Sequence, residues 1–323
     1  MSRHANSRQV FPLVNFVCRS NETNVANQIV LRGISDYEWQ HIFQTPGAAA
    51  DPDVIHACTH ALVIDYEAER TAVKEPADQA AIDSANRYVT ALHLHHEGDV
   101  LAPVSFGHPL PIPLNGPWTL RGRMSYKPMF LTTNYFFQSA DVAPVATLNA
   151  QLGSQTCLNE KRLQLAISRF ESGFERHTAE DLLLDSFIGL ETCLIGDNTS
   201  ELSYRLSLRG AALLANSRAP ECTRAELLAG YFARSKIVHE GLNLRSIQSL
   251  KPFMKQAQAY RTTCGEDLSA TSLPQRAQAI LRDTIREILS RIPSRKMKGV
   301  ESDIDLQIAR ALKTGAEHNE IDE

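Results

Sequence analysis

The stretch FARSKIVHEG at residues 232–241 places an arginine and a histidine, Arg234 and His239, five positions apart. Histidine takes up or releases a proton near neutral pH, and arginine keeps its charge and forks around a phosphate group. RNA carries its own nucleophile, the 2′-hydroxyl, so a base, an acid and a cation at the phosphoryl group are sufficient to cleave it. Cleavage by such a pair would need no metal ion, and its expected first product would be a 2′,3′-cyclic phosphate.

As a bare pattern, an arginine followed by a histidine has little weight. With 24 arginines and 11 histidines in 323 residues, each fixed spacing is expected about 0.8 times by chance. A second pair of this kind, Arg87 and His93, straddles a predicted boundary between a helix and a strand, and we interpret it as structural. What distinguishes Arg234 and His239 is their place near the end of a predicted helix within a helical segment.

The spacing of Arg234 and His239 also predicts an assembly. Five residues along an α-helix correspond to about 500° of rotation and about 7.5 Å of rise, so the two side chains lie roughly 140° apart and do not share one face. Two copies of the helix about a two-fold axis would place both pairs in one composite cleft and supply separate acid and base histidines. The geometry therefore favours a homodimer.

Four further residues are candidates beside this pair. Ser235 could bond phosphate, although an exposed helical serine is at least as good an interpretation. Glu191 and Arg205 fall inside apolar helical stretches, where an unpaired charge is costly, so they either orient the catalytic pair or form a structural ion pair. Lys236 is interpreted as a solvated cation or as a contact to the RNA backbone.

From about residue 155 apolar residues recur at helical spacing, which predicts an all-helical second half. Thr178 precedes an acidic first turn and is expected to cap a helix over 179–195. Thr223 and Glu226 have the spacing of a capping box, and Gly241 suits the left-handed residue that ends a helix. Further helices are expected from Leu163 to Phe174, from about Ser200, over 277–292 and, as a short one, around Ile304 to Leu312.

The first half holds most of the 15 prolines and the best patterns of period two. Larger apolar and polar residues alternate from Trp118 to Tyr126, which predicts a strand. Shorter apolar or β-branched runs predict further strands at 28–31, 62–66 and 89–94, with a helix over 76–86 between two of them. The first half is therefore expected to be an α+β domain.

Four stretches of the second half carry a resemblance to a known family: LQLAISRFESGFER (163–176), AEDLLLDSFIGLETCLI (179–195), ELSYRLSLRGAALL (201–214) and FARSKIVHEG (232–241). In this order they resemble the Apea-like group of the HEPN superfamily over about residues 150–295. The stretch ALHLHHEGDVLAPVSF (91–106) also resembles the segment that precedes such domains. The resemblance implies a dimerising bundle of four or five helices, an RNase-type motif at Arg234 and His239, and a bacterial role in phage defence. Non-catalytic members of the superfamily also exist.

Composition divides the chain into an α+β sensing or regulatory domain at 1–150, a HEPN-like helical bundle at 151–298 and an acidic tail at 299–323. The middle segment carries 21 Lys and Arg against 16 Asp and Glu, which is compatible with RNA as a polyanionic partner. The tail carries 2 basic against 7 acidic residues, and we expect its end to be frayed.

The six cysteines are scattered, with no two closer than 29 residues, so we expect mostly buried, reduced thiols. No run of eighteen apolar residues occurs, and no apolar stretch follows the first charges. Neither a membrane span nor a secretory signal is therefore expected, and the protein is predicted to be cytoplasmic without a membrane partner.

The histidine cluster His93, His95 and His96 raises the question of a metal site. In a strand His93 and His95 would share one face, but only Glu97 and Asp99, in an apparent turn, stand at a supporting spacing. We therefore expect neither a metal ligand nor a cofactor.

The leading prediction is a metal-independent endoribonuclease that acts on RNA as a homodimer, while the N-terminal domain recognises a phage-derived or cellular trigger. The alternative is a non-catalytic dimer that binds RNA, a nucleotide or a partner protein. A third hypothesis is an effector or toxin that is silenced by a partner or by modification of its helical domain.

Overall fold

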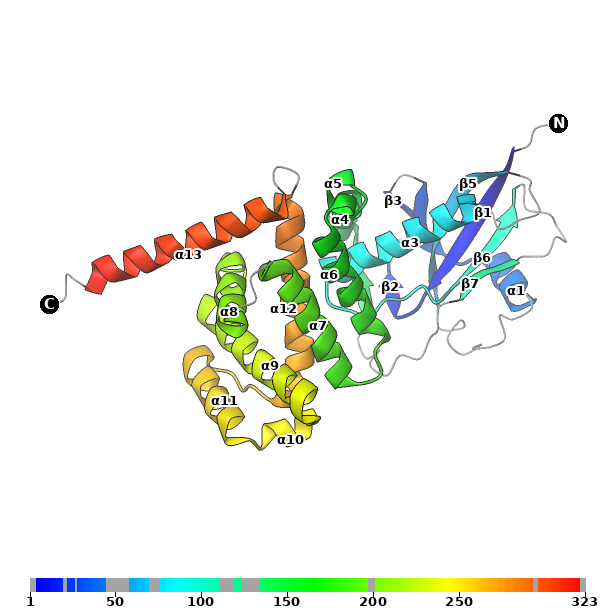
Figure 1. Ribbon diagram of the computed structural model, residues 1–323. Coiled ribbons are helices and arrows are strands. Elements are labelled where there is room, and N and C mark those ends of the chain that lie inside the picture. Colours follow the sequence, from blue (N-terminus) through cyan, green and yellow to red (C-terminus); the bar gives the residue numbers. More distant parts are fainter. Residues whose placement is uncertain are drawn as a thin grey trace. The chain divides into compact units, whose positions relative to one another are not determined.

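The structure, a computed structural model, describes residues 4–19, 22–26, 28–44, 58–69, 76–110, 119–123, 134–196, 201–292 and 296–319. The chain forms two compact units, Met1–Gly153 and Ser154–Glu323. The first contains a sheet and helices, and the second contains helices and no strand among its described residues (Figure 1). The predicted order of an α+β half followed by an all-helical half is confirmed.

The N-terminal unit is built on an antiparallel sheet with the strand order β3-β4-β5-β1-β6-β7. The central strand β1 pairs with β5 along its whole length. Two short strands, β2 and β8, pair in parallel beside it. The elements are β1 (His4–Leu13), β2 (Phe16–Cys18), β3 (Glu22–Ala26), β4 (Ile29–Gly33), α1 (Asp36–Gln44), β5 (His60–Glu69), α3 (Pro76–His95), β6 (Val104–Pro109), β7 (Thr119–Arg123), β8 (Tyr135–Phe137) and α4 (Val142–Leu152).

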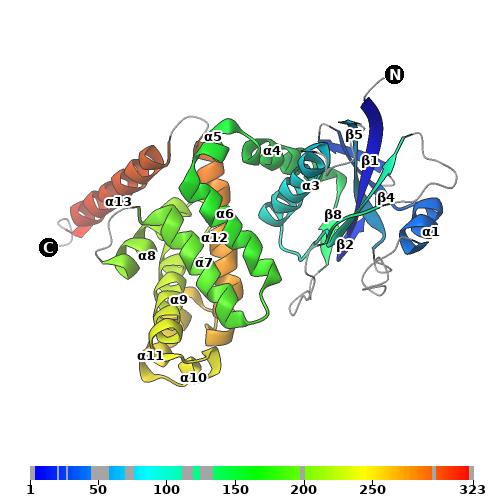
Figure 2. The same cartoon turned by 45° about the vertical axis from the view of Figure 1, so that its right-hand side comes forward.

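Both faces of this sheet are apolar and covered. Val10 of β1 and Val63 of β5 are buried together with Ile42 of α1. Because side chains alternate along a strand, the neighbouring pair Phe11 and Leu62, also buried, points to the other face. Helix α3 lies against that side, opposite α1 (Figure 2).

The strand predicted at 62–66 is confirmed as part of β5, and the one predicted at 28–31 corresponds to β4, which begins one residue later, at Ile29. The alternating run from Trp118 contains β7, and its flanking residues lie outside the described part of the chain. The strand predicted at 89–94 is wrong, because these residues continue α3 to His95. All residues from 88 to 94 are buried, and a helix without a polar face shows no helical period and resembles a buried strand in sequence.

In the C-terminal unit, α7 packs against α6, α9 and α12, which lie around it in both views (Figures 1 and 2). The helices are α5 (Gln155–Asn159), α6 (Lys161–Ser172), α7 (Ala179–Leu194), α8 (Leu202–Leu213), α9 (Pro220–Glu240), α10 (Leu244–Gln248), α11 (Lys251–Cys264), α12 (Leu273–Arg291) and α13 (Met297–Asn319).

The helices predicted from periodicity correspond to α6, α7, α8, α9 and α12. Periodicity predicts no helix at α5, α10 or α11. Among the described residues, no helix combines the length and apolar character needed to cross a bilayer.

Two predicted helix starts have different outcomes. Thr178 caps α7 as predicted, because its hydroxyl oxygen accepts the backbone N–H of Asp181 at 3.0 Å. The capping box predicted at Thr223 and Glu226 is wrong, because α9 already begins at Pro220. Proline suits the first turn of a helix, where its missing N–H has no partner to lose. Thr223 and Glu226 are buried inside α9 instead.

The acidic segment at the end of the chain begins as part of the helical unit. Ile304 of α13 is 1% exposed. Asp305 accepts two hydrogen bonds from the guanidinium of Arg209 on α8, at 2.8 and 2.6 Å. Glu301 forms an ion pair with Arg162 on α6. The short helix predicted around Ile304 is therefore part of a longer helix whose first turns are packed and paired.

Candidate active site

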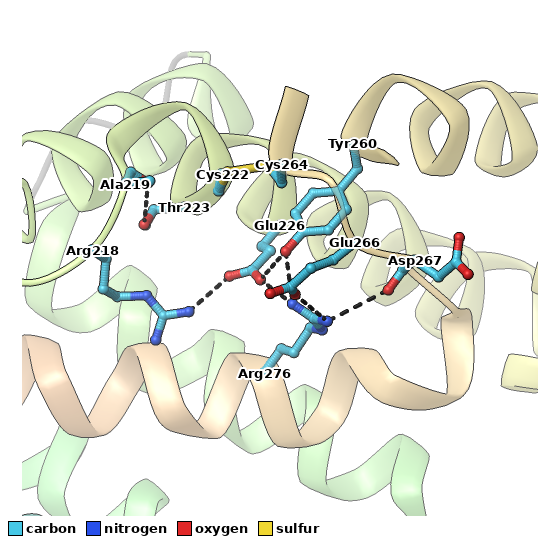
Figure 3. Close-up of a disulfide and its surroundings, with 10 residues drawn as sticks. All are labelled: Arg218, Ala219, Cys222, Thr223, Glu226, Tyr260, Cys264, Glu266, Asp267 and Arg276. Atoms are coloured by element: carbon cyan, nitrogen blue, oxygen red, sulfur yellow. Dashed lines mark hydrogen bonds and ion pairs between the residues drawn. A yellow bond between two sulfur atoms is a disulfide. The ribbon is translucent and has the colours of Figure 1, made fainter. Parts of the chain in front are cut away.

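Helix α9 carries both predicted catalytic residues, and its first half is fixed by a buried carboxylate. The side chain of Glu226 is 3% exposed and forms ion pairs with Arg218 at 2.9 Å and with Arg276. It also accepts a hydrogen bond from the hydroxyl of Tyr260 at 2.8 Å (Figure 3). Burial and the adjacent carboxylate raise the pKa of Tyr260 to about 12. These partners compensate for the cost of burying the charge of Glu226.

A disulfide joins Cys222 in the first turn of α9 to Cys264 at the end of α11 (Figure 3). The expectation of reduced thiols is wrong for this pair. The two cysteines are 42 residues apart, and the packing of α11 against α9 brings their Cα atoms to 5.8 Å. Cys157 and Cys193 are buried thiols as expected, and burial raises their pKa values to about 11 and about 12.

Arg234 lies in the second half of α9 and faces α7. Its Nη2 atom is 3.4 Å from both carboxylate oxygens of Glu191. Its guanidinium carbon lies 5.6 Å from the ring centre of Tyr231, one turn earlier on α9. The side chains of Arg234 and Glu191 are 23% and 22% exposed. The guanidinium is therefore oriented by a long ion pair and an aromatic ring, and it keeps part of its surface open to solvent.

The carboxylate of Glu191 has too few polar partners among the described residues to stabilise its charged form fully. Burial raises the pKa of Glu191, and the charge of Arg234 offsets this shift only in part. Its Oε1 atom is buried and accepts no hydrogen bond from the residues that the structure describes. Burial likewise raises the pKa of Tyr231, and the charge of Glu191 adds to the effect. Glu191, Tyr231 and Arg234 thus form one contact group, of which sequence reasoning missed Tyr231. Its position three residues before Arg234, on the same helix side, was the available signal.

Arg205 takes no part in this group. It lies on α8 and is partly exposed, and its side chain makes no hydrogen bond or ion pair with the described residues. The buried guanidinium of α8 belongs to Arg209, one turn further on, which also donates to the carbonyl of Leu194 at 2.6 Å. The structure therefore does not bring Arg205 to Arg234.

His239 lies in the last turn of α9 and is exposed. The helix ends at Gly241, whose φ of 65° is the left-handed conformation that the sequence predicts there. The N–H groups of Gly241 and Leu242 close onto carbonyls of the last turn. Glu180 at the start of α7 accepts the backbone N–H of Leu244 at 3.0 Å. His239 is therefore presented to solvent on a helix end that is firmly terminated.

Lys236 is held by its own helix. Its ammonium group forms an ion pair with Glu240, one turn later, and lies 5.5 Å from the ring centre of Phe232, one turn earlier. An RNA phosphate would have to compete with Glu240 for this cation.

The second half of α9 thus has two sides. Ser235 and His239, four residues apart, share one side, whereas Arg234 is turned towards Glu191 on α7. A single copy of the uninterrupted helix keeps Arg234 and His239 on different faces.

No family model matches the chain, and neither do curated proteins or solved structures at a significant level. The residues of α9 and their surroundings therefore carry the functional proposal.

Proposed function

We propose that the helical unit is a metal-independent endoribonuclease of the HEPN type, with Arg234 at the phosphate and His239 as the proton-transfer group. The observation that carries this proposal is the second half of α9. There an exposed histidine follows a part-exposed arginine that a carboxylate and an aromatic ring already orient.

The reaction is attack of the RNA 2′-hydroxyl on the adjacent phosphorus. A base removes the hydroxyl proton as the new bond forms, and an acid protonates the 5′-oxygen as the old bond breaks, which leaves a 2′,3′-cyclic phosphate. His239 is suited to either transfer. Arg234 stabilises the charge that develops on the phosphoryl oxygens.

Two copies of the unit complete the proposed site. Arg234 and His239 leave α9 on different faces, so a two-fold arrangement of α9 is the economical way to bring both residue types to one phosphate. The second histidine of such a homodimer would then provide the acid when the first acts as the base. Ser235, on the side of His239, is available to hydrogen-bond the same phosphate.

A non-catalytic module is the second candidate, and the contact between Arg234 and Glu191 favours it. A carboxylate beside the guanidinium offsets its charge, so a phosphate has to compete with Glu191. In this case the helical dimer binds RNA, a nucleotide or a partner protein without cutting.

For either activity we propose that the α+β unit responds to a phage-derived or cellular trigger and that the protein acts in the bacterial cytoplasm, in defence or as a toxin. The sequence resemblance supports this role. A partner or a modification that restrains the helical unit is compatible with it.

The test is cleavage of bulk tRNA and rRNA in EDTA by the wild-type protein and by the Arg234→Ala, His239→Ala and His177→Ala proteins, with analysis of the fragment ends. We expect cyclic-phosphate ends from wild type and from His177→Ala, whose exposed histidine lies before α7. We expect a loss of about 100-fold or more for His239→Ala. Undiminished cleavage by His239→Ala would sink the assignment of this histidine. RNA binding without scission by every protein would favour the binding module.

A further inference from the structure

Two histidines at the end of α3 meet an aspartate that is remote in sequence. His95 is the last residue of α3, His96 follows it, and Asp141 immediately precedes α4. The Nε2 atoms of His95 and His96 each lie 3.1 Å from the same oxygen, Oδ1 of Asp141. The three atoms all lie within 4.8 Å of one another. The acidic partner that the strand interpretation lacked is thus supplied by another part of the N-terminal unit.

The spacing of these atoms suits ligands of one metal ion. Zinc binds imidazole nitrogen and carboxylate oxygen at about 2.0–2.2 Å, so neighbouring ligand atoms in tetrahedral or octahedral geometry lie about 2.9–3.5 Å apart. Both nitrogen–oxygen separations fall within this range. The rings of His95 and His96 lie 3.9 Å apart between centres, and both imidazoles present Nε2 to Oδ1 of Asp141.

The carboxylate of Asp141 is held in place by the backbone. Its other oxygen, Oδ2, accepts the N–H of Gln138 at 2.7 Å, which leaves Oδ1 directed at the two histidines. Hydrogen bonds of this kind orient the ligands of protein metal sites. His93 is excluded as a ligand through Nε2, because that atom donates to the carbonyl of Val100 at 2.6 Å and the side chain is buried.

The group is closed on one side and open on the other. The side chains of His95 and Asp141 are each 11% exposed, whereas that of His96 is 50% exposed. Three protein ligands with an accessible side can accommodate an ion that keeps one or more water molecules.

We propose that His95, His96 and Asp141 form a binding site for a divalent transition-metal ion, with Zn²⁺ as the best match. Two imidazoles and one carboxylate suit Zn²⁺, Fe²⁺ or Co²⁺, whereas Mg²⁺ and Ca²⁺ take mainly oxygen ligands. The ion would link the end of α3 to the start of α4 within the N-terminal unit. The site is independent of the proposed RNA cleavage, which needs no metal.

The test uses the full-length protein, stripped with EDTA, dialysed and titrated with ZnCl₂ against a chromogenic chelator. We expect one Zn²⁺ per chain for wild type and for His177→Ala, and at least a 10-fold weaker affinity for His96→Ala. Asp141→Asn is a second variant, with circular dichroism as the check on its fold. His96 is half exposed, so its replacement should disturb the packing of the unit less than that of Asp141, and circular dichroism checks its fold as well.

Cobalt distinguishes this site from binding at a cysteine. We expect the Co²⁺-loaded protein to show visible d–d bands that His96→Ala loses, without the near-ultraviolet charge-transfer band of a thiolate ligand. No zinc bound by wild type, equal affinity in His96→Ala, or a thiolate band would each overturn the proposal.

Discussion

The two halves of α9 differ in what surrounds them. In the first half, Cys222 is cross-linked to α11 and Glu226 is buried among charged and phenolic partners. In the second half, Arg234 is part-exposed, and Val238 and His239 are exposed. The difference teaches that one helix can be anchored by its first half while its second half leaves polar side chains open to solvent. Substitutions in the first half should therefore affect unfolding, and those in the second half should affect the proposed RNA cleavage.

The largest expected effect on stability is that of Glu226→Ala. The substitution leaves Arg218 and Arg276 without their shared carboxylate, and breaking a buried ion pair on one side costs about 3–5 kcal/mol. Urea unfolding measures the loss. Glu221→Ala, at an exposed position in the first turn of α9, is the control and should change the free energy of unfolding by less than about 0.5 kcal/mol. Equal effects of the two substitutions would remove the contrast between the halves.

The second-largest loss of stability is expected for Cys222→Ser. A cross-link between residues 42 apart restricts the unfolded chain and contributes about 3–4 kcal/mol in the loop-entropy description. Dithiothreitol should lower the stability of wild type to that of Cys222→Ser and leave the variant unchanged. If the reductant had no effect on wild type, Cys222 and Cys264 would not be bonded in solution.

Gly230→Ala tests the junction between the halves. A Cβ atom there would lie 2.6 Å from the Phe187 ring of α7, so α9 would have to move away or the ring would have to turn. Overpacking of this kind costs about 1–3 kcal/mol, from which the better helix propensity of alanine subtracts about 1 kcal/mol. We expect a net loss of about 1 kcal/mol in thermal unfolding, and almost none for Ser235→Ala. A gain in stability for Gly230→Ala would show that the close contact is not maintained.

The smallest effect is expected for Glu191→Gln, and its sign is the informative part. Burial raises the pKa of Glu191, so the folded protein binds this proton more tightly than the unfolded chain does. Stability is therefore lost as the pH rises from the unfolded pKa through the folded one. Glutamine at this position should be at least as stable as wild type near neutral pH, with a flatter pH dependence of Tm between pH 4 and 8. A clearly lower Tm at neutral pH would mean that the ion pair with Arg234 stabilises the fold after all.

The elements that the sequence predicts correctly are those with one buried side and one exposed side. The apolar residues of α12 recur at helical spacing, and α7 begins with a capping threonine and an acidic first turn. Both signals can be read from the order of the residues. The end of α3 shows neither signal, because it is buried on every side, and its residue order therefore predicts a strand. The pattern of Thr223 and Glu226 was ambiguous, since a serine or threonine followed by glutamate also fits a helix interior with buried partners.

For the candidate sites, too, sequence patterns predict only the residues that lie on one and the same element. Arg234, Ser235 and His239 lie on one helix, so helix geometry alone gave their relative directions. Asp141 lies 45 residues after His96, and no local pattern relates the two. The same holds for Cys222 and Cys264, which only the packing of two helices brings together. Contacts between distant segments depend on the tertiary fold, which periodicity does not encode.

The parallel pairing of β2 with β8 has a consequence for how the protein is made. Phe16 lies opposite Tyr135, so a strand near the start of the chain obtains its partner only after almost the entire N-terminal unit has left the ribosome. Closing so long a loop is slow, because its entropic cost precedes the contacts that compensate for it. In the C-terminal unit, consecutive helices such as α6 with α7 and α8 with α9 pack directly on each other. We therefore expect the C-terminal unit, although synthesised last, to fold faster once released, and the N-terminal unit to need protection from misfolding for longer.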